Sequence, residues 1–188
     1  MKDHSDEAGI IRNCKTGRLR HQEVFYRHFY GYVMGISLRY AYTRTDASEI
    51  VNDSFLKVFR NIKKYDEELS IKPWLRKITV NTAIDYYRKN ARFEPVLEIE
   101  QAVNESFDEN QVDQLIYEDL KKLLDDLPEI YRLIFNLYEI DGYTHQEIAK
   151  KLDINESTSR SYLTRAKKKM RVLVEKFFER KNERKIRT

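Results

Sequence analysis

The sequence is poor in the residues that build small cross-linked or metal-bound folds. It has one cysteine, Cys14, and four histidines in 188 residues. One cysteine excludes an internal disulfide and any zinc site made of several cysteines, and the histidines are scattered along the chain. Only five glycines and three prolines, with 35% charged residues, are typical of a helix-rich protein rather than of a sandwich of short strands. No metal and no cofactor is predicted.

Long apolar runs are also missing. The first residues, MKDHSDEAGIIRNC, contain no apolar run, and nowhere do eighteen apolar residues follow one another without interruption. The sequence therefore predicts neither a signal peptide nor membrane insertion. We expect a cytoplasmic protein in a reducing environment.

Groups that carry out catalysis are missing as well. A nuclease or nucleotide-processing enzyme needs carboxylates clustered on a metal ion, a phosphate-binding loop or an activated nucleophile. The sequence has no G-x-x-x-x-G-K-[ST] pattern, and no base stands near Cys14. The closest pair of acids, Asp125 and Asp126, stands at a predicted helix–helix junction, where we expect N-capping. The protein is predicted not to be an enzyme.

Charge is abundant and is segregated by sign. Residues 57–92 hold ten Lys or Arg against four Asp or Glu, a net charge of +6. Residues 94–119 hold nine acids and no base, and residues 156–188 hold twelve Lys or Arg against four acids. Two basic segments separated by an acidic one are thus hidden in a modest net charge of +4.

Apolar residues at helical spacing predict an all-α chain with two small helical domains. In the first domain, Asp46 is the expected N-cap of a helix, with Glu49 three residues later, and Pro73 stands in the first turn of the next helix. The chain divides into an N-terminal extension (1–22), a helical bundle (23–92), a flexible acidic linker (93–111), a second helical domain (112–178) and a basic tail (179–188).

The second domain contains a predicted helix-turn-helix. Thr144 and Glu147 form a capping box before "THQEIAKKL", "DIN" makes a short turn, and "ESTSRSYLTRAKKKMRVLVEKFF" forms one long helix. Asp153 stands in the turn where a glycine is common, and Asp tolerates the left-handed backbone better than most residues.

The two sides of that long helix differ in chemistry. At about 100° per residue, one side gathers Leu163, Met170, Val174 and Phe177. The other side gathers Ser157, Ser161, Thr164, Arg165 and Lys168, with Arg160 and Arg171 on a flank. Such groups suit base edges and phosphates in a major groove. A solvated charged face is the alternative, but the capping box, the short turn and the small residues beside the arginines favour a DNA-reading helix.

The segment "KPWLRKITVNTAIDYYRKNAR" interleaves cations and aromatic rings. Cations that follow phosphates and rings that accept unstacked bases are typical of single-strand binding. For Trp74 alone, packing in the core is the favoured interpretation.

Two segments together resemble one family. "DASEIVNDSFLKVFRNIKKY…IKPWLRKITVNTAIDYYRK" resembles the core-binding and promoter-melting domain of a bacterial sigma factor. "LPEIYRLIFNLYEIDGYTHQEIAKKLDINESTSRSYLTRAKKKMRVLV" resembles the fourth-region domain of the same family. Their order, with no third domain between them, is similar to the extracytoplasmic-function (ECF) group. The resemblance implies a sigma factor that binds core RNA polymerase, recognises the −35 and −10 promoter elements and promotes strand opening. The alternative is a stand-alone helix-turn-helix regulator that binds duplex operator DNA.

The resemblance also implies roles for single residues. The residues expected to dock on the clamp helices of the polymerase's largest subunit are Asp46, Glu49, Ile50, Asp53, Ser54, Leu56 and Lys57. The loop of residues 65–72 would hold a base flipped out of the −10 element. The residues expected at this element are Tyr65, Trp74, Arg76, Lys77, Asn81, Tyr86 and Arg88. Those expected at the −35 element are Arg160, Ser161, Thr164 and Arg165, with Lys167 and Lys168 on phosphates.

Other parts of the chain are less closely tied to the family. The acidic linker would thread a basic nucleic-acid channel of the polymerase, with its carboxylates imitating phosphates. An exposed clamp-docking surface is a natural target for an anti-sigma factor, although no residue reports one directly. Residues 157–162, Ser-Thr-Ser-Arg-Ser-Tyr, replace the family's frequent Gly-Thr-Val-Lys-Ser-Arg, so the promoter sequence cannot be carried over. Residues 1–22 match no part of the family that we can name.

Overall fold

The computed structural model describes residues 4–90 and 123–186 of the chain. These residues form helices and no strand, which confirms the all-α prediction. The chain divides into two compact units, Met1–Ala91 and Arg92–Thr188. The predicted acidic linker, residues 93–111, lies outside the described residues. Within the described parts, no helix combines the length and the apolar character that a membrane crossing needs.

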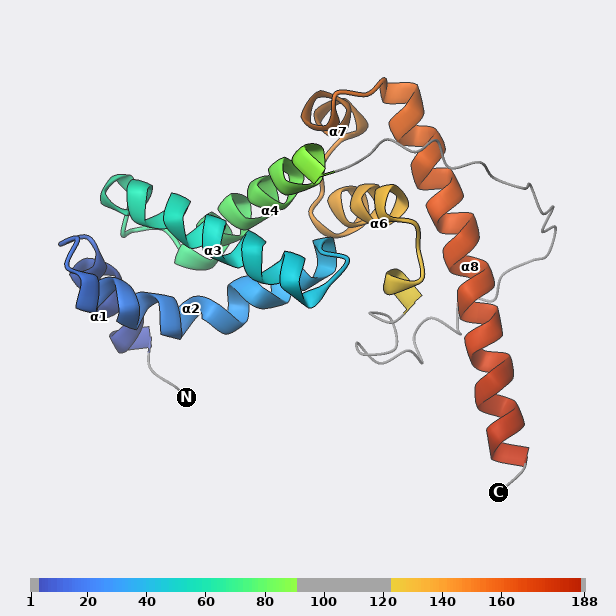
Figure 1. Cartoon of the computed structure of the whole chain (residues 1–188), viewed down its shortest axis with the longest axis horizontal. Coiled ribbons are helices and arrows are strands. Elements are labelled where there is room, and N and C mark those ends of the chain that lie inside the picture. Colours follow the sequence, from blue (N-terminus) through green and yellow to red (C-terminus); the bar gives the residue numbers. More distant parts are fainter. Residues whose placement is uncertain (1–3, 91–122, 187–188) are drawn as a thin grey trace. The chain divides into compact units, whose positions relative to one another are not determined.

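The N-terminal unit is a bundle of helices. It comprises α1 (His4–Cys14), α2 (Leu19–Tyr40), α3 (Arg44–Asn61), the short 3-10 helix η1 (Ile62–Lys64) and α4 (Ile71–Asn90). Helices α2, α3 and α4 pack on one another in pairs, and α1 packs on α2 (Figure 1). Their shared core is aromatic, since the ring of Phe25 contacts Phe29 of the same helix and Phe55 of α3. Leu75 of α4 is fully buried. Pro73 stands in the first turn of α4, as predicted.

The start of α3 differs from the prediction. Asp46 is not the N-cap, because the helix begins three residues earlier than predicted and Thr43 occupies that position. The hydroxyl of Thr43 accepts a hydrogen bond from the Asp46 N–H (3.1 Å), and the Asp46 carboxylate accepts one from the Thr43 N–H (2.9 Å). This is a capping box in which Asp takes the place of the usual Glu or Gln. Thr and Asp are both good cap residues, so the sequence alone is compatible with a start at either position, and the structure has the earlier one.

The second unit is built around its last helix. Its described elements are α6 (Glu129–Phe135), the π-helical η3 (Asn136–Ile140), α7 (His145–Leu152) and α8 (Glu156–Ile186). Met170 and Val174 of α8 are buried against Leu123, Leu124 and Leu127, so the apolar side of α8 is the docking side, as the helical wheel predicted.

The acidic pair before α6 does not have the expected capping role. The N-cap of α6 is Pro128, which makes no side-chain cap hydrogen bond. Asp125 instead accepts a hydrogen bond of 2.7 Å from the guanidinium of Arg132. Arg132 is only 1% exposed, and a buried cation needs such a partner.

Candidate nucleic-acid interface

One face of α4 carries four of the residues predicted at the −10 element. Trp74, Lys77, Asn81 and Arg88 fall within about 60° of one another on the helical wheel. Lys77 and Arg88 are exposed, and Trp74 and Asn81 are half-buried. The opposite face of α4 carries Leu75, Thr79 and Ala83 into the core. The bundle therefore presents two cations, an amide and an indole ring on one face, which suits a nucleic acid.

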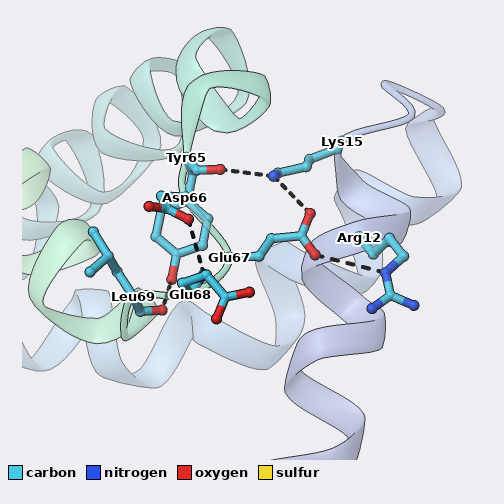
Figure 2. A network of polar contacts seen from close by, with 7 residues as sticks. All are labelled: Arg12, Lys15, Tyr65, Asp66, Glu67, Glu68 and Leu69. Atoms are coloured by element: carbon cyan, nitrogen blue, oxygen red, sulfur yellow. Dashed lines mark hydrogen bonds and ion pairs between the residues drawn. The ribbon is translucent and has the colours of Figure 1, made fainter.

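A short loop, residues 65–70, leads into this face. We call it the −10 loop, after the promoter element that it is predicted to meet. Its first residue, Tyr65, is 5% exposed, and the ring lies 5.1 Å from that of Trp74. The Tyr65 hydroxyl donates a hydrogen bond to the carbonyl of Leu69, which closes the loop on itself (Figure 2). A stacking contact between Tyr65 and a flipped base would require this ring to leave its buried place.

Two of the predicted −10 residues lie off that face. Arg76 is half-buried on another side of α4. Tyr86 turns towards α3 and donates a hydrogen bond of 2.7 Å to Asp46. Beside it, Lys57 of α3 forms an ion pair of 2.8 Å with Asp85 of α4. The two helices that were predicted to bind DNA and polymerase are thus joined by two polar contacts.

The predicted polymerase-docking residues divide between the surface and the core of α3. Glu49, Asp53 and Leu56 are exposed. Leu56 is an apolar residue, and 53% of its surface is exposed to solvent. Ile50 and Ser54 are each 1% exposed, and the Ser54 hydroxyl donates to the Ile50 carbonyl within the helix. In this conformation, therefore, only the exposed residues and the half-buried Asp46 and Lys57 offer a surface to a partner.

The helix-turn-helix has the predicted construction. The Thr144–Glu147 capping box starts α7, and Asp153 ends it in the left-handed conformation with φ 56° and ψ 48°. Within the described parts of the chain, no other residue except glycine has a positive φ. The Ile154 N–H donates to the Ala149 carbonyl (3.1 Å), which fixes the turn before α8.

The residues predicted to read the −35 element share the exposed face of α8. These are Arg160, Ser161, Thr164, Arg165, Lys167 and Lys168, and all are exposed. Two of the cations already have acidic partners, since Arg160 pairs with Glu156 and Lys167 with Glu139 (2.7 Å). Binding to phosphate or to a base edge would exchange these surface ion pairs, which are weak in water, for contacts with the nucleic acid.

One polar contact that holds the motif together was not predicted. His145, the first residue of α7, places Nδ1 3.0 Å from the Ser159 hydroxyl of α8, and its ring stacks on Tyr138 at 4.5 Å between centroids. Ser159 is fully buried on the docking side of α8, four residues before Leu163. A small polar residue on the apolar stripe is the one signal that could have revealed it.

Residues of the N-terminal extension were missed as well. Lys15 and Arg12, from α1 and the turn after it, contact the −10 loop (Figure 2). No periodicity or motif links positions 50 residues apart, so this contact could not be read from the sequence.

Known proteins share both parts of this architecture. The sigma-70 region 2 family model matches residues 25–93, and the sigma-70 region 4 model matches residues 117–170. RNA polymerase sigma factor SigV of Bacillus subtilis is 29% identical over 176 residues, which cover 94% of this chain and 98% of SigV. The ECF RNA polymerase sigma-E factor of Haemophilus influenzae is 25% identical, covering 89% of this chain and 94% of its own. Among solved structures, the sigma factor RpoE in complex with the anti-sigma factor NepR from Bartonella quintana aligns at 19% identity, with a TM-score of 0.48 over 81% of this chain and 98% of that one.

Proposed function

Since the chain belongs to the extracytoplasmic-function group of the sigma-70 family, we propose that it binds core RNA polymerase, reads the −35 and −10 elements of a promoter and promotes strand opening. The observation that carries this proposal is that one chain presents two different faces of exposed cations and polar groups, one on each unit. The α4 face offers an indole ring, an amide and cations to a single strand, and the α8 face offers small polar groups and cations to a major groove.

The chemistry of transcription belongs to the polymerase in this proposal. The protein contributes recognition and binding energy and is not itself a catalyst. It would act in the cytoplasm, where core polymerase meets the promoter. A stand-alone regulator is not favoured, because the N-terminal unit matches a sigma region rather than a sensory domain.

Two helices have distinct parts in the mechanism. Exposed residues of α3 (Glu49, Asp53 and Leu56) dock the N-terminal unit on the polymerase. The α4 face then lies where the −10 element opens, with Asn81 at the unpaired base and Lys77 and Arg88 on phosphates. Counterion release at these contacts makes binding steeply dependent on salt.

Run-off transcription tests the proposal. Bacterial core polymerase transcribes genomic fragments with and without the full chain, and we expect discrete start sites that depend on the protein. Asn81→Ala and Arg165→Ala should abolish or strongly reduce these products, whereas Arg27→Met, on the exposed side of α2, should leave them unchanged. No new start site, together with tight binding of the protein alone to duplex DNA, would favour a stand-alone regulator instead.

A further inference from the structure

The N-terminal extension contacts the −10 loop close to where the loop begins. Lys15, directly after α1, donates hydrogen bonds from Nζ to the Tyr65 carbonyl oxygen and to Glu67 Oε1, each 2.8 Å long. Arg12 Nε lies 3.7 Å from the other carboxylate oxygen of Glu67. Figure 2 shows the two basic side chains of the extension reaching the loop from one side.

The extension also contacts the chain just after the −10 loop. Glu7 of α1 has Oε1 3.7 Å from Nζ of Lys72 and 3.5 Å from Nε2 of His28. The Tyr32 hydroxyl of α2 donates to the Lys72 carbonyl (3.1 Å). The loop is therefore attached to neighbouring helices on both sides of its turn.

Lys15 contacts Tyr65, the residue whose side chain closes the loop, and the loop has a further hydrogen bond of its own. The Tyr65 hydroxyl closes the loop on Leu69, and the Glu68 N–H donates to Asp66 Oδ1 (3.1 Å). The Lys15 ammonium also lies 5.8 Å from the centre of the Tyr65 ring. For a lysine it is well covered, with a side chain that is 22% exposed. One ammonium group thus contacts the backbone, the ring and a carboxylate of the same short loop.

The loop is also acidic, which is unfavourable beside DNA. Asp66, Glu67 and Glu68 follow one another, and phosphates would repel them. The hydrogen bond from Lys15, helped by the charges of Lys15 and Arg12, lowers the pKa of Glu67 below its ordinary value, so this carboxylate is charged and compensated from the extension.

We infer that the N-terminal extension is a positioning element for the −10 loop. Lys15 fixes a conformation in which the Tyr65 ring stays packed inside the loop and an unpaired base is accepted by the rest of the loop and the α4 face. The inference rests on the proposed function and deepens it, because it assigns part of the −10 selectivity to residues outside the two matched regions. A loop held in its binding conformation before DNA arrives loses less conformational entropy on binding, which raises affinity and sharpens the choice of base.

The test uses full-length protein in holoenzyme on a promoter found by run-off transcription. Permanganate reactivity of unpaired thymines measures strand opening, and a set of promoters with each base at each −10 position measures selectivity. We expect Lys15→Met to reduce opening about three- to tenfold and to flatten the base preference, because a hydrogen bond to a charged group is lost at a partly exposed site. Lys15→Arg retains donors for both oxygens and should restore opening and selectivity.

Controls separate positioning from loss of fold. Arg27→Met removes a cation of α2 whose ion-pair partner is Glu23 of the same helix and not a residue of the loop. This variant should change neither readout. Glu67→Gln should have a smaller effect than Lys15→Met, and the double variant should lose less than the product of the two single effects, because both act on one contact.

Three results would overturn the inference. One is a Lys15→Met holoenzyme that opens promoters and selects bases as the wild type does. Another is a loss that Lys15→Arg fails to restore. The third is that Lys15→Met lowers polymerase affinity and thermal stability as much as it lowers strand opening, which would make Lys15 a general stabilising residue. If the wild-type holoenzyme opens no promoter at all, the proposed function fails. If the wild-type holoenzyme opens promoters and the Lys15 variants open them equally well, only the positioning role fails.

Discussion

The hydroxyl of Tyr86 lies 2.7 Å from Oδ1 of Asp46 and donates a hydrogen bond to it. The bond connects α4 to the first turn of α3, where the same carboxylate completes the capping box with Thr43. Burial raises the pKa of Asp46, but the hydrogen bonds from the Tyr86 hydroxyl and from Thr43 outweigh it, and the pKa lies below its ordinary value. If α3 moved when it bound a partner, this hydrogen bond would transmit the movement to α4.

Tyr86→Phe should lower the free energy of unfolding of the N-terminal unit by about 1 kcal/mol at neutral pH, because it removes the hydrogen bond to a carboxylate and keeps the ring. Urea unfolding followed by the fluorescence of Trp74, the chain's one tryptophan, measures this unit. Tyr30→Phe is the matched control, because the Tyr30 ring packs at a tilt against Tyr26 and lies on α2.

The pH dependence of that loss identifies its cause. Since the folded pKa of Asp46 is depressed, its contribution to stability is complete above the unfolded value of about 3.9 and is lost as pH falls through the folded value. The difference between wild type and Tyr86→Phe should therefore shrink towards pH 3. A difference that stays constant down to that pH would point to altered ring packing instead.

Asp153→Gly should stabilise the helix-turn-helix. A left-handed backbone costs a residue with a Cβ roughly 1 kcal/mol, although the greater freedom of glycine in the unfolded chain offsets part of the gain. Asp153→Val should destabilise it by at least as much, because a β-branched side chain is poorly tolerated at this φ. Hydrogen exchange at the Ile154 amide, which donates to Ala149, reports the local stability.

A glycine three residues earlier provides the opposite control. Lys150→Gly, inside α7, should destabilise the helix by about 1 kcal/mol, as glycine does in a helix interior. If both glycine variants accelerated exchange at Ile154, the left-handed turn would not be a site of strain.

His145 should titrate below the ordinary histidine range. Burial lowers the pKa of its ring, the charge of Arg160 and then that of Lys167 lower it further, and Glu156 opposes them. The unfolded chain then takes up the proton first as pH falls, so the second unit loses stability between about pH 6.5 and the lower folded pKa. An NMR titration of the ring protons measures the folded value directly.

Replacing Arg160 tests how much its charge contributes to the lowered pKa of His145. Arg160→Gln should raise the pKa of His145 towards its ordinary value, whereas Lys176→Gln, four turns further along α8, should not move it. An unchanged titration in Arg160→Gln would show that the charge of Arg160 does not contribute to the lowered pKa of His145.

Sequence periodicity was sufficient for the helices from α2 onwards and for the exposed polar side of α8, but it did not reveal α1. Leu163, Met170 and Val174 are buried as the wheel required, and the capping box at Thr144 and the left-handed Asp153 follow from local chemistry. Such features depend on residues within one or two turns of each other, which is why a single sequence reveals them.

Sequence periodicity could not predict contacts between positions that are distant in the chain. The carboxylate of Asp46 fits a cap by sequence alone, but its bond to Tyr86 spans 40 residues and depends on how α3 and α4 pack. The same holds for Lys15 and Tyr65. The docking set implied by the family resemblance includes Ile50 and Ser54, and both are buried. Ile50 belongs to the apolar stripe of α3, and Ser54 lies about one helical turn further along the same side.

Arg165 and Lys168 should differ in what their loss does to promoter binding, although both are exposed on the same face of α8. Arg165→Ala should cost about 1–3 kcal/mol of discrimination between the promoter and a version with an altered −35 element, because a bidentate contact to a base edge is specific. Lys168→Ala should weaken binding to all sequences alike and reduce the salt slope by about one, because a phosphate contact carries no sequence information. Holoenzyme affinities for both promoters at several salt concentrations separate the two effects, with Lys176→Ala as the control on the same helix. An equal loss on both promoters in Arg165→Ala would make that residue a phosphate contact and move the reading of the −35 element to Arg160 and its small polar neighbours.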